Sequence, residues 1–180
     1  HGSRVFLVHE DERVTFEALA RAAIRLAEHM RALGVKPGDR IAIAMRNVPE
    51  WPVAFYAGQL VGAIVTPLNA WWTGAELEYG LSDSGAKLLL ADGERWDRIA
   101  PHRGVLPDLA HVLVSRGGDG SLEAVIGTPD GWHALPDLPT PAPFLEPDDD
   151  ATIFYTSGTT GRPKGALGTQ RNICSNIMSG

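Results

Sequence analysis

Residues 156–164, with the sequence TSGTTGRPK, bring together the kinds of groups that hold a phosphate. The hydroxyl donors of this stretch are Thr156, Ser157, Thr159 and Thr160. Gly158 and Gly161 allow backbone N–H groups to approach an anion without obstruction by a side chain. Lys164 adds a compact positive charge, and Pro163 stiffens the turn, which reduces the entropy lost when a ligand is ordered there. This combination predicts a phosphate-binding loop.

The spacing within this loop differs from two common phosphate motifs. The Walker pattern G-x-x-x-x-G-K-[ST] is not met, because Lys164 follows Gly161 by three residues and precedes Gly165. The Rossmann pattern G-x-G-x-x-G is not met either, because Gly158 has no glycine two residues away. A flexible Ser/Thr/Gly linker is the alternative. The apolar run that precedes the loop and the internal Pro-Lys pair favour an ordered nucleotide-phosphate loop of another kind.

The elements around the loop follow an alternating pattern. Residues 151–155 (ATIFY) are typical of a buried strand, and residues 169–180 predict the first turns of a helix, so the loop is expected between a strand and a helix. The upstream pattern is helix 16–33, strand 40–45, helix 47–62, strand 63–68, helix 74–85 and strand 87–91. Thr15 can cap the first helix, and Thr73 with Glu76 has the spacing of a capping box. Because continuous apolar strands alternate with helices, we expect an α/β fold with a largely parallel sheet covered on both faces.

The chain divides by composition into three parts. They are an N-terminal α/β subdomain (4–115), a Gly/Pro-rich connector (116–147) and a segment with the strand, the loop and the start of the next helix (148–180). Residues 4–15 predict a hairpin and residues 111–115 a strand. The connector is interpreted as a surface loop with a short helix near 122–126. The first three residues, His-Gly-Ser, are expected to be a vector-derived remnant or an interior start.

Charge and cysteine content exclude several classes of function. Sixteen basic and 22 acidic residues give a net charge of −6, and no basic patch is present, so we expect no nucleic-acid partner. The single cysteine, Cys174, excludes an intramolecular disulfide and is typical of a reducing cytoplasm, where we expect the protein. With no histidine near it in sequence, Cys174 is expected to be a buried thiol and not a nucleophile. The six histidines show no metal-ligand spacing, so no protein metal site is expected.

Residues 51–73 form an uncharged stretch long enough to span a bilayer. Prolines, glycines and polar residues interrupt it, and no continuous apolar run approaches the length of a membrane helix. A buried helix followed by a buried strand is therefore expected, with no transmembrane segment. Peripheral contact with a membrane stays open.

The segment YTSGTTGRPKGA, residues 155–166, is similar to the signature phosphate loop of the adenylate-forming superfamily. This superfamily contains acyl- and aryl-CoA ligases, luciferases and the adenylation domains of peptide synthetases. Residues 34–90 also resemble the N-terminal part of fatty-acid–CoA ligases almost throughout, whereas residues 116–147 carry little of that pattern. The fold implied is an incomplete N-terminal portion of the large adenylate-forming domain.

The resemblance implies a two-step reaction with ATP, a carboxylic acid and coenzyme A. The carboxylate attacks the α-phosphate of ATP to give an acyl-adenylate and pyrophosphate, and the thiol then takes the acyl group. The loop of such enzymes holds the β- and γ-phosphates. That role falls here on Thr156, Ser157, Gly158, Thr159, Thr160, Gly161 and Lys164. Mg²⁺ is expected to accompany ATP, without an assigned protein ligand.

Several of the family's motifs are absent from these 180 residues. They lack the Tyr-Gly-x-Thr-Glu stretch, the ribose-binding aspartate, the hinge and the C-terminal lysine, so no catalytic residue is assigned. Gln170 also stands where many relatives place a histidine that borders the substrate pocket. The 180 residues alone are expected to bind nucleotide poorly and to catalyse nothing. An uncovered apolar sheet face would allow them to self-associate.

The expected substrate is a medium- or long-chain fatty acid. An aryl or another acid is the alternative within the superfamily. A non-catalytic nucleotide-binding fragment is the alternative outside enzyme function.

Overall fold

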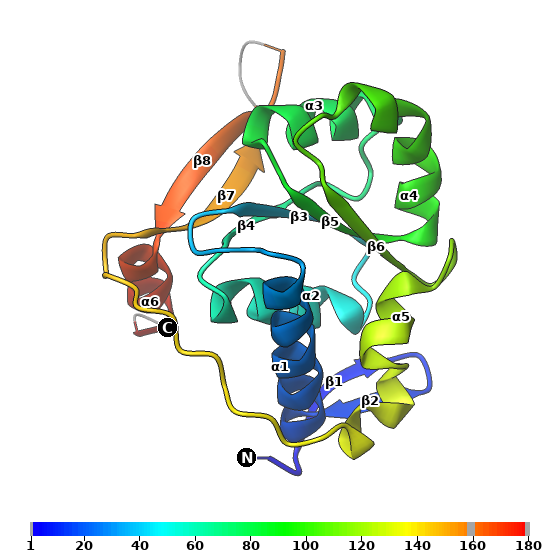
Figure 1. The fold of residues 1–180 in the computed structure, drawn as a ribbon, viewed down its shortest axis with the longest axis vertical. Helices are drawn as coiled ribbons and strands as arrows, with labels where there is room; N and C mark the ends of the chain where they lie inside the picture. The colour runs from blue at the N-terminus through cyan, green and yellow to red at the C-terminus, as the bar shows by residue number, and fades with distance from the viewer. Residues whose placement is uncertain (1, 158–160, 179–180) are drawn as a thin grey trace.

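A six-stranded sheet forms the middle layer of the molecule (Figure 1), in a computed structural model that describes residues 2–157 and 161–178. Its strands are β3 (Arg40–Ala44), β4 (Ile64–Pro67), β5 (Leu88–Asp92), β6 (His111–Ser115), β7 (Asp150–Thr156) and β8 (Lys164–Thr169). The strand order is β6-β5-β3-β4-β7-β8, and every neighbouring pair is parallel except β7 and β8. The predicted α/β class with a largely parallel sheet is confirmed.

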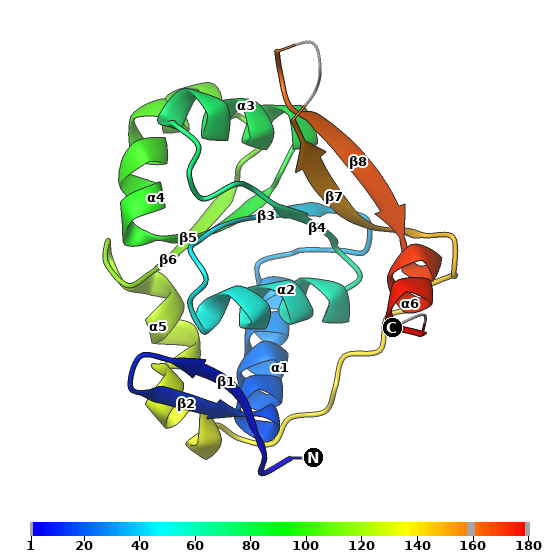
Figure 2. The ribbon, with the colours of Figure 1, turned by 180° about the vertical axis from the view of Figure 1, so that it is seen from behind.

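Helices cover both faces of the sheet, as Figures 1 and 2 show from opposite sides. α1 (Phe16–Ala32) and α2 (Glu50–Leu60) pack on one face; α3 (Gly74–Ser84) and α4 (Gly93–Ile99) pack on the other. Residues 41–44 of β3 are all apolar because they face the two cores alternately. Ile41 and Ile43 belong to the core beneath α1 and α2, whereas Ala42 and Ala44 belong to the core beneath α3 and α4.

Local sequence signals account for the helix ends. The Thr15 hydroxyl accepts a hydrogen bond from the backbone N–H of Ala18 and so caps α1. The predicted capping box of α3 is present, because Thr73 and Glu76 bond reciprocally through side chain and backbone. Gly85 ends α3 in the left-handed conformation that glycine adopts without strain. Thr73 and Gly85 thus fix the two ends of α3, the helix that connects β4 to β5.

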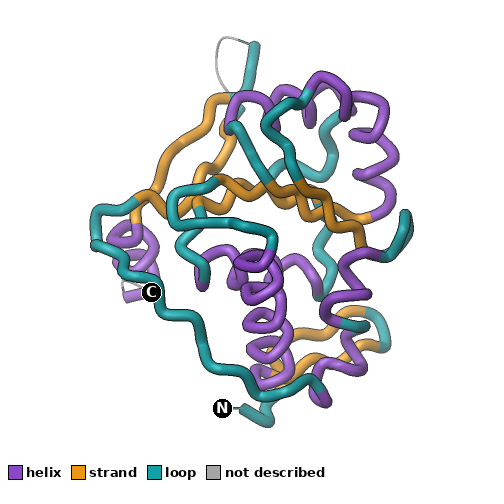
Figure 3. Tube along the Cα trace, viewed as in Figure 1, coloured by secondary structure: helices purple, strands orange, loops and turns teal. Residues whose placement is uncertain are grey.

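The region 116–147 is not a surface loop throughout. It contains α5 (Ser121–Ile126), close to the predicted short helix, and a 3-10 helix, η2 (Pro129–Ala134). Leu122, Ile126 and Trp132 are buried in the same core as α1 and α2, so the surface-loop interpretation is wrong for these two helices. Residues 135–149 then run to β7 without helix or strand, in the part drawn as loop in Figure 3. The boundaries at 115 and 147 stay predictions.

The N-terminal hairpin is confirmed as β1 (Val5–His9) and β2 (Glu12–Thr15), which form a separate two-stranded sheet beside α1. The uncharged stretch 51–73 contains β4 and all of α2 except its first residue, Glu50, so it forms a helix followed by a strand as expected. Within residues 2–157 and 161–178, no helix is both long enough and apolar enough to cross a membrane.

The loop that starts at residue 157 leads to a strand and not directly to a helix. β8 pairs antiparallel with β7, and α6 (Gln170–Met178) begins only after β8 ends. Glycines at 165 and 168 weaken the strand signal of KGALGT, which explains why the pattern missed it. Both glycines are needed for close packing against β7. A Cβ added to Gly165 would lie 2.8 Å from Cγ2 of Ile153, and a Cβ added to Gly168 would lie 2.7 Å from Oγ1 of Thr152.

Candidate phosphate-binding site

The candidate loop lies at the carboxyl edge of the parallel sheet. β7 is parallel to β4, and Thr156 is the last residue of β7. In open α/β sheets, this edge is where ligands bind. The two described limbs of the loop leave the β7–β8 hairpin next to α3 (Figure 1). Its position therefore agrees with a ligand-binding role.

Thr156 and Lys164 form the base of the loop. They are direct partners in the β7–β8 ladder, so their side chains lie on the same face of the hairpin. Both residues are exposed, and the Thr156 hydroxyl donates to the Lys164 carbonyl at 3.5 Å. Their neighbour Tyr155 points to the opposite face, toward α3. The pair thus presents one hydroxyl and one ammonium group to solvent on one side of the hairpin.

The rest of the predicted site is described only in part. Ser157 and Gly161 are exposed, and Gly161 has a φ of +94° with open space where a Cβ would lie. Gly158, Thr159 and Thr160 lie outside the described residues. The structure therefore brings Thr156 and Lys164 together, and the shared role of all seven residues stays a prediction.

The returning limb of the loop lies against α3. The Tyr79 hydroxyl is 3.2 Å from the carbonyl oxygen of Pro163, to which it donates, and 3.4 Å from Oδ1 of Asp83. The guanidinium of Arg162 lies 5.3 Å from the centre of the Tyr79 ring. Sequence reasoning missed Tyr79 as part of the site. Its four-residue spacing from Asp83 on a predicted helix marks a shared helix face, but it does not show that this face meets the loop.

Tyr155 anchors the incoming limb to the same helix. Its hydroxyl donates to Oδ2 of Asp83 at 2.7 Å and also lies 3.3 Å from the Gly80 carbonyl oxygen. Burial, together with the Asp83 carboxylate, raises the pKa of the Tyr155 phenol above its ordinary value. The phenol therefore keeps its proton and remains a donor. Gly80 allows Leu68 and Trp72 to pack closely against α3, because an added Cβ would be 2.9 Å from atoms of both residues.

Cys174 and Gln170 lie on α6, which begins at the end of the β7–β8 hairpin opposite to Thr156 and Lys164. Cys174 is exposed, so the expectation of a buried thiol is wrong. None of the side chains that are described on this helix, those of residues 170–175, belongs to either apolar core, which agrees with the exposure. The Gln170 amide lies 3.5 Å from the side-chain oxygen of Gln59 on α2.

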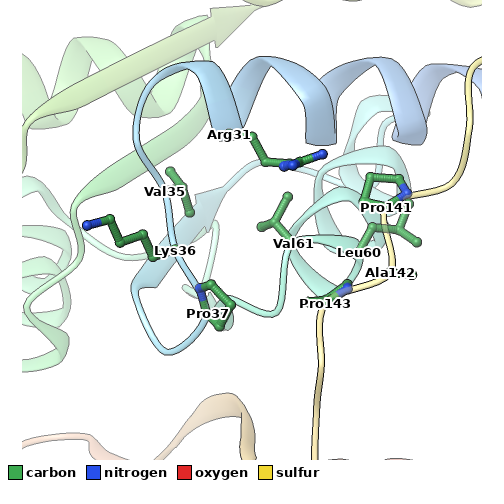
Figure 4. Close-up of a pocket in the computed structure, with 9 residues that line it drawn as sticks. All are labelled: Arg31, Val35, Lys36, Pro37, Leu60, Val61, Pro141, Ala142 and Pro143. Atoms are coloured by element: carbon green, nitrogen blue, oxygen red, sulfur yellow. The ribbon is translucent and has the colours of Figure 1, made fainter.

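A separate pocket lies at the other edge of the sheet (Figure 4). It is lined by Arg31, Val35, Lys36, Pro37, Leu60, Val61, Pro141, Ala142 and Pro143. Residues 35–37 precede β3 and residue 61 precedes β4, so this pocket faces the amino ends of the parallel strands. It is therefore remote from the phosphate loop and does not extend that site.

The described residues offer no ready-made metal centre. Within residues 2–157 and 161–178, no group of three or more His, Cys, Asp or Glu side chains is arranged to hold a metal ion. The donors at the base of the loop, a hydroxyl and an ammonium group, suit phosphate oxygens.

Comparison with known proteins agrees with this geometry. The sequence model described as AMP-binding enzyme matches residues 1–180. The chain belongs to the AMP-binding enzyme family. Within the family, it is 36% identical over 173 residues to a feruloyl-CoA synthase of Amycolatopsis sp, covering 94% of this chain and 32% of the relative. It is 32% identical over 171 residues to a long-chain-fatty-acid–CoA ligase of Mycobacterium tuberculosis, covering 94% and 32%.

Solved structures show the same fold in AMP-binding relatives. An anthranilate CoA ligase in complex with anthranoyl-AMP has a TM-score of 0.82 at 28% identity, over 94% of this chain and 31% of that one. The N-terminal domain of FACL13 from Mycobacterium tuberculosis has a TM-score of 0.75 at 30% identity, over 89% and 38%. The chain spans about a third of the length of the curated relatives cited here and corresponds to the N-terminal portion of acyl- and aryl-CoA ligases.

Proposed function

We propose that this chain is the N-terminal portion of an AMP-forming acid–CoA ligase. The carboxylate of the acid attacks the α-phosphate of ATP, which gives an acyl-adenylate and releases pyrophosphate. The sulfur of coenzyme A then attacks the acyl carbon and AMP leaves. The chain's own part in this reaction is to hold the β- and γ-phosphates through the loop of residues 156–164.

One observation carries this proposal. Thr156 and Lys164 share a face of the β7–β8 hairpin at the carboxyl edge of the sheet, in a chain that matches the AMP-binding enzyme family from end to end. Negative charge builds on the departing pyrophosphate, and fixed donors aimed at that charge lower the barrier. Lys164 supplies a positive charge there, and Thr156 supplies a hydroxyl. We infer that Mg²⁺ arrives bound to the phosphates of ATP.

We further propose that the acid is a medium- or long-chain fatty acid. Identity of 32% to a long-chain-fatty-acid–CoA ligase supports this choice. An aryl acid is the second candidate, because the chain is 36% identical to a feruloyl-CoA synthase and shares its fold with an anthranilate CoA ligase. A cytoplasmic location, inferred from the cysteine content, is part of the proposal.

The test is ATP–pyrophosphate exchange, followed by AMP release with a panel of acids and coenzyme A. A longer polypeptide that contains this chain should exchange pyrophosphate with a fatty acid present, and the 180 residues alone should not. Preference for an aryl acid in the panel would move the substrate to the second candidate. Strong exchange by the 180 residues alone, or no AMP release by the longer polypeptide with any acid, would overturn the proposal.

A further inference from the structure

We infer that Tyr79 and Asp83 of α3, together with Tyr155 of β7, are positioning residues that hold both limbs of the phosphate loop in place. This inference rests on the proposed function of the loop. It adds a role for a helix outside the phosphate-loop motif.

The three side chains form one continuous contact between α3 and the loop. Asp83 accepts from Tyr155 at 2.7 Å through one carboxylate oxygen, and its other oxygen lies 3.4 Å from the Tyr79 hydroxyl. Tyr79 in turn donates to the backbone carbonyl of Pro163 at 3.2 Å. Tyr155 immediately precedes Thr156, and Pro163 immediately precedes Lys164. The contact therefore clamps the chain next to each of the two donors at the base of the loop.

The ring geometry supports the same role. The rings of Tyr79 and Tyr155 lie 6.5 Å apart with an angle of 69° between their planes. The rings of Trp72 and Tyr155 lie 5.6 Å apart, so Tyr155 is held from a second side. Arg162 lies over the Tyr79 ring, which draws this loop cation toward α3. A surface of aromatic side chains thus supports the loop from one side, while Thr156 and Lys164 face the other side.

Such a clamp lowers the cost of binding phosphate. Backbone that becomes ordered only upon binding loses conformational entropy, and this loss reduces the affinity. Fixing the backbone beside Thr156 and Lys164 in advance removes part of that cost. Tyr79 contacts the loop backbone through the Pro163 carbonyl, so its effect does not depend on which side chain occupies position 163.

The first measurement is amide hydrogen exchange on the 180-residue protein, read from peptides that cover residues 161–169. Tyr79→Phe keeps the ring over Arg162 but removes the hydroxyl, and Tyr79→Leu removes both. Tyr56→Phe is the matched control, because Tyr56 is 45% exposed on α2. We expect several-fold faster exchange for Tyr79→Phe, a larger increase for Tyr79→Leu and none for Tyr56→Phe. Unchanged exchange in both Tyr79 variants would overturn the inference.

The second measurement is binding of inorganic tripolyphosphate, followed by ³¹P NMR. Loss of the Tyr79 hydroxyl should weaken binding about fivefold, the equivalent of one ordinary hydrogen bond. The unfolding midpoint of Tyr79→Phe should stay close to that of Tyr56→Phe, which separates positioning from a general loss of stability. Faster exchange with unchanged tripolyphosphate affinity would overturn the positioning role. If the unaltered chain and Lys164→Ala bind tripolyphosphate equally, the proposed function of the loop fails, and hydrogen exchange alone decides whether the clamp exists.

Discussion

The guanidinium Nε of Arg116 donates to a carboxylate oxygen of Glu50 at 2.8 Å, and the Glu50 side chain is only 2% exposed. The same guanidinium donates through Nη2 to Glu12 at 2.7 Å. Arg116 follows β6, Glu50 opens α2, and Glu12 opens β2. One arginine therefore joins three segments that are distant in sequence and neutralises a buried charge.

Removal of Arg116 should destabilise the fold. Arg116→Ala leaves Glu50 buried and unpaired, and we expect a loss of about 3 kcal/mol in the free energy of unfolding. Glu12→Gln is the control, because Glu12 is partly exposed and its loss leaves the buried pair intact; it should cost less than about 1 kcal/mol. Urea unfolding followed by tryptophan fluorescence measures both. Equal losses in the two variants would contradict this account of Glu50.

Close packing of α2 on the sheet predicts that Gly58→Ala is destabilising. A Cβ at position 58 would lie 2.4 Å from Cδ1 of Ile41 and 2.7 Å from Cγ2 of Val65, both in the buried core. Alanine favours a helix over glycine by about 1 kcal/mol, but overpacking costs about 1–3 kcal/mol and should prevail. Gly104→Ala is the matched control, because nothing lies within 4 Å of a Cβ built there. If the two variants had equal free energies of unfolding, the close packing of α2 on Ile41 and Val65 would be contradicted.

The environment of Tyr155 predicts a loss of stability at alkaline pH. Burial and the Asp83 carboxylate raise the pKa of this phenol in the folded chain, so the folded state binds the proton more tightly than the unfolded state does. The contribution is complete below the ordinary phenol pKa of about 10 and is lost as the pH rises above that value. Tyr155→Phe should remove the alkaline-shifted component from the absorbance titration of the three tyrosines and flatten the decline in urea midpoint at high pH. Loss of a component that titrates near the ordinary phenol pKa, in place of the alkaline-shifted one, would contradict the assignment.

The sequence predicted those parts of the fold that depend on local pattern. Buried strands such as β3 and β5 each contain a run of four apolar residues, and the Thr73–Glu76 capping box marks the start of α3 directly. β8 was missed because its two glycines are there to accommodate Ile153 and Thr152 of the neighbouring strand. The interpretation of residues 116–147 as a surface loop does not predict the burial of Trp132, because burial beneath α1 depends on contacts between distant segments that no local pattern records.

The candidate site was predictable in composition but not in its surroundings. The hydroxyl, glycine and lysine content of residues 156–164 predicts phosphate binding, and that role stays a prediction. The contact of Pro163 with Tyr79 joins residues 84 positions apart, so it depends on the crossing of β7 beside α3. The pairing of Thr156 with Lys164 could not be predicted from the sequence either, because it depends on β8, which pairs antiparallel with β7.

The central claim is that the β7–β8 loop binds the phosphates of ATP, and titration of the 180-residue protein with inorganic tripolyphosphate tests it most directly. Binding is expected to be weak but measurable by ³¹P NMR, and Lys164→Ala should reduce the affinity by about tenfold, as expected for the loss of a charged contact. Lys36→Ala is the matched control, since Lys36 is an exposed lysine at the opposite edge of the sheet. Weakened binding in Lys164→Ala alone is the predicted result. Equal binding by the unaltered chain and both variants would contradict the account.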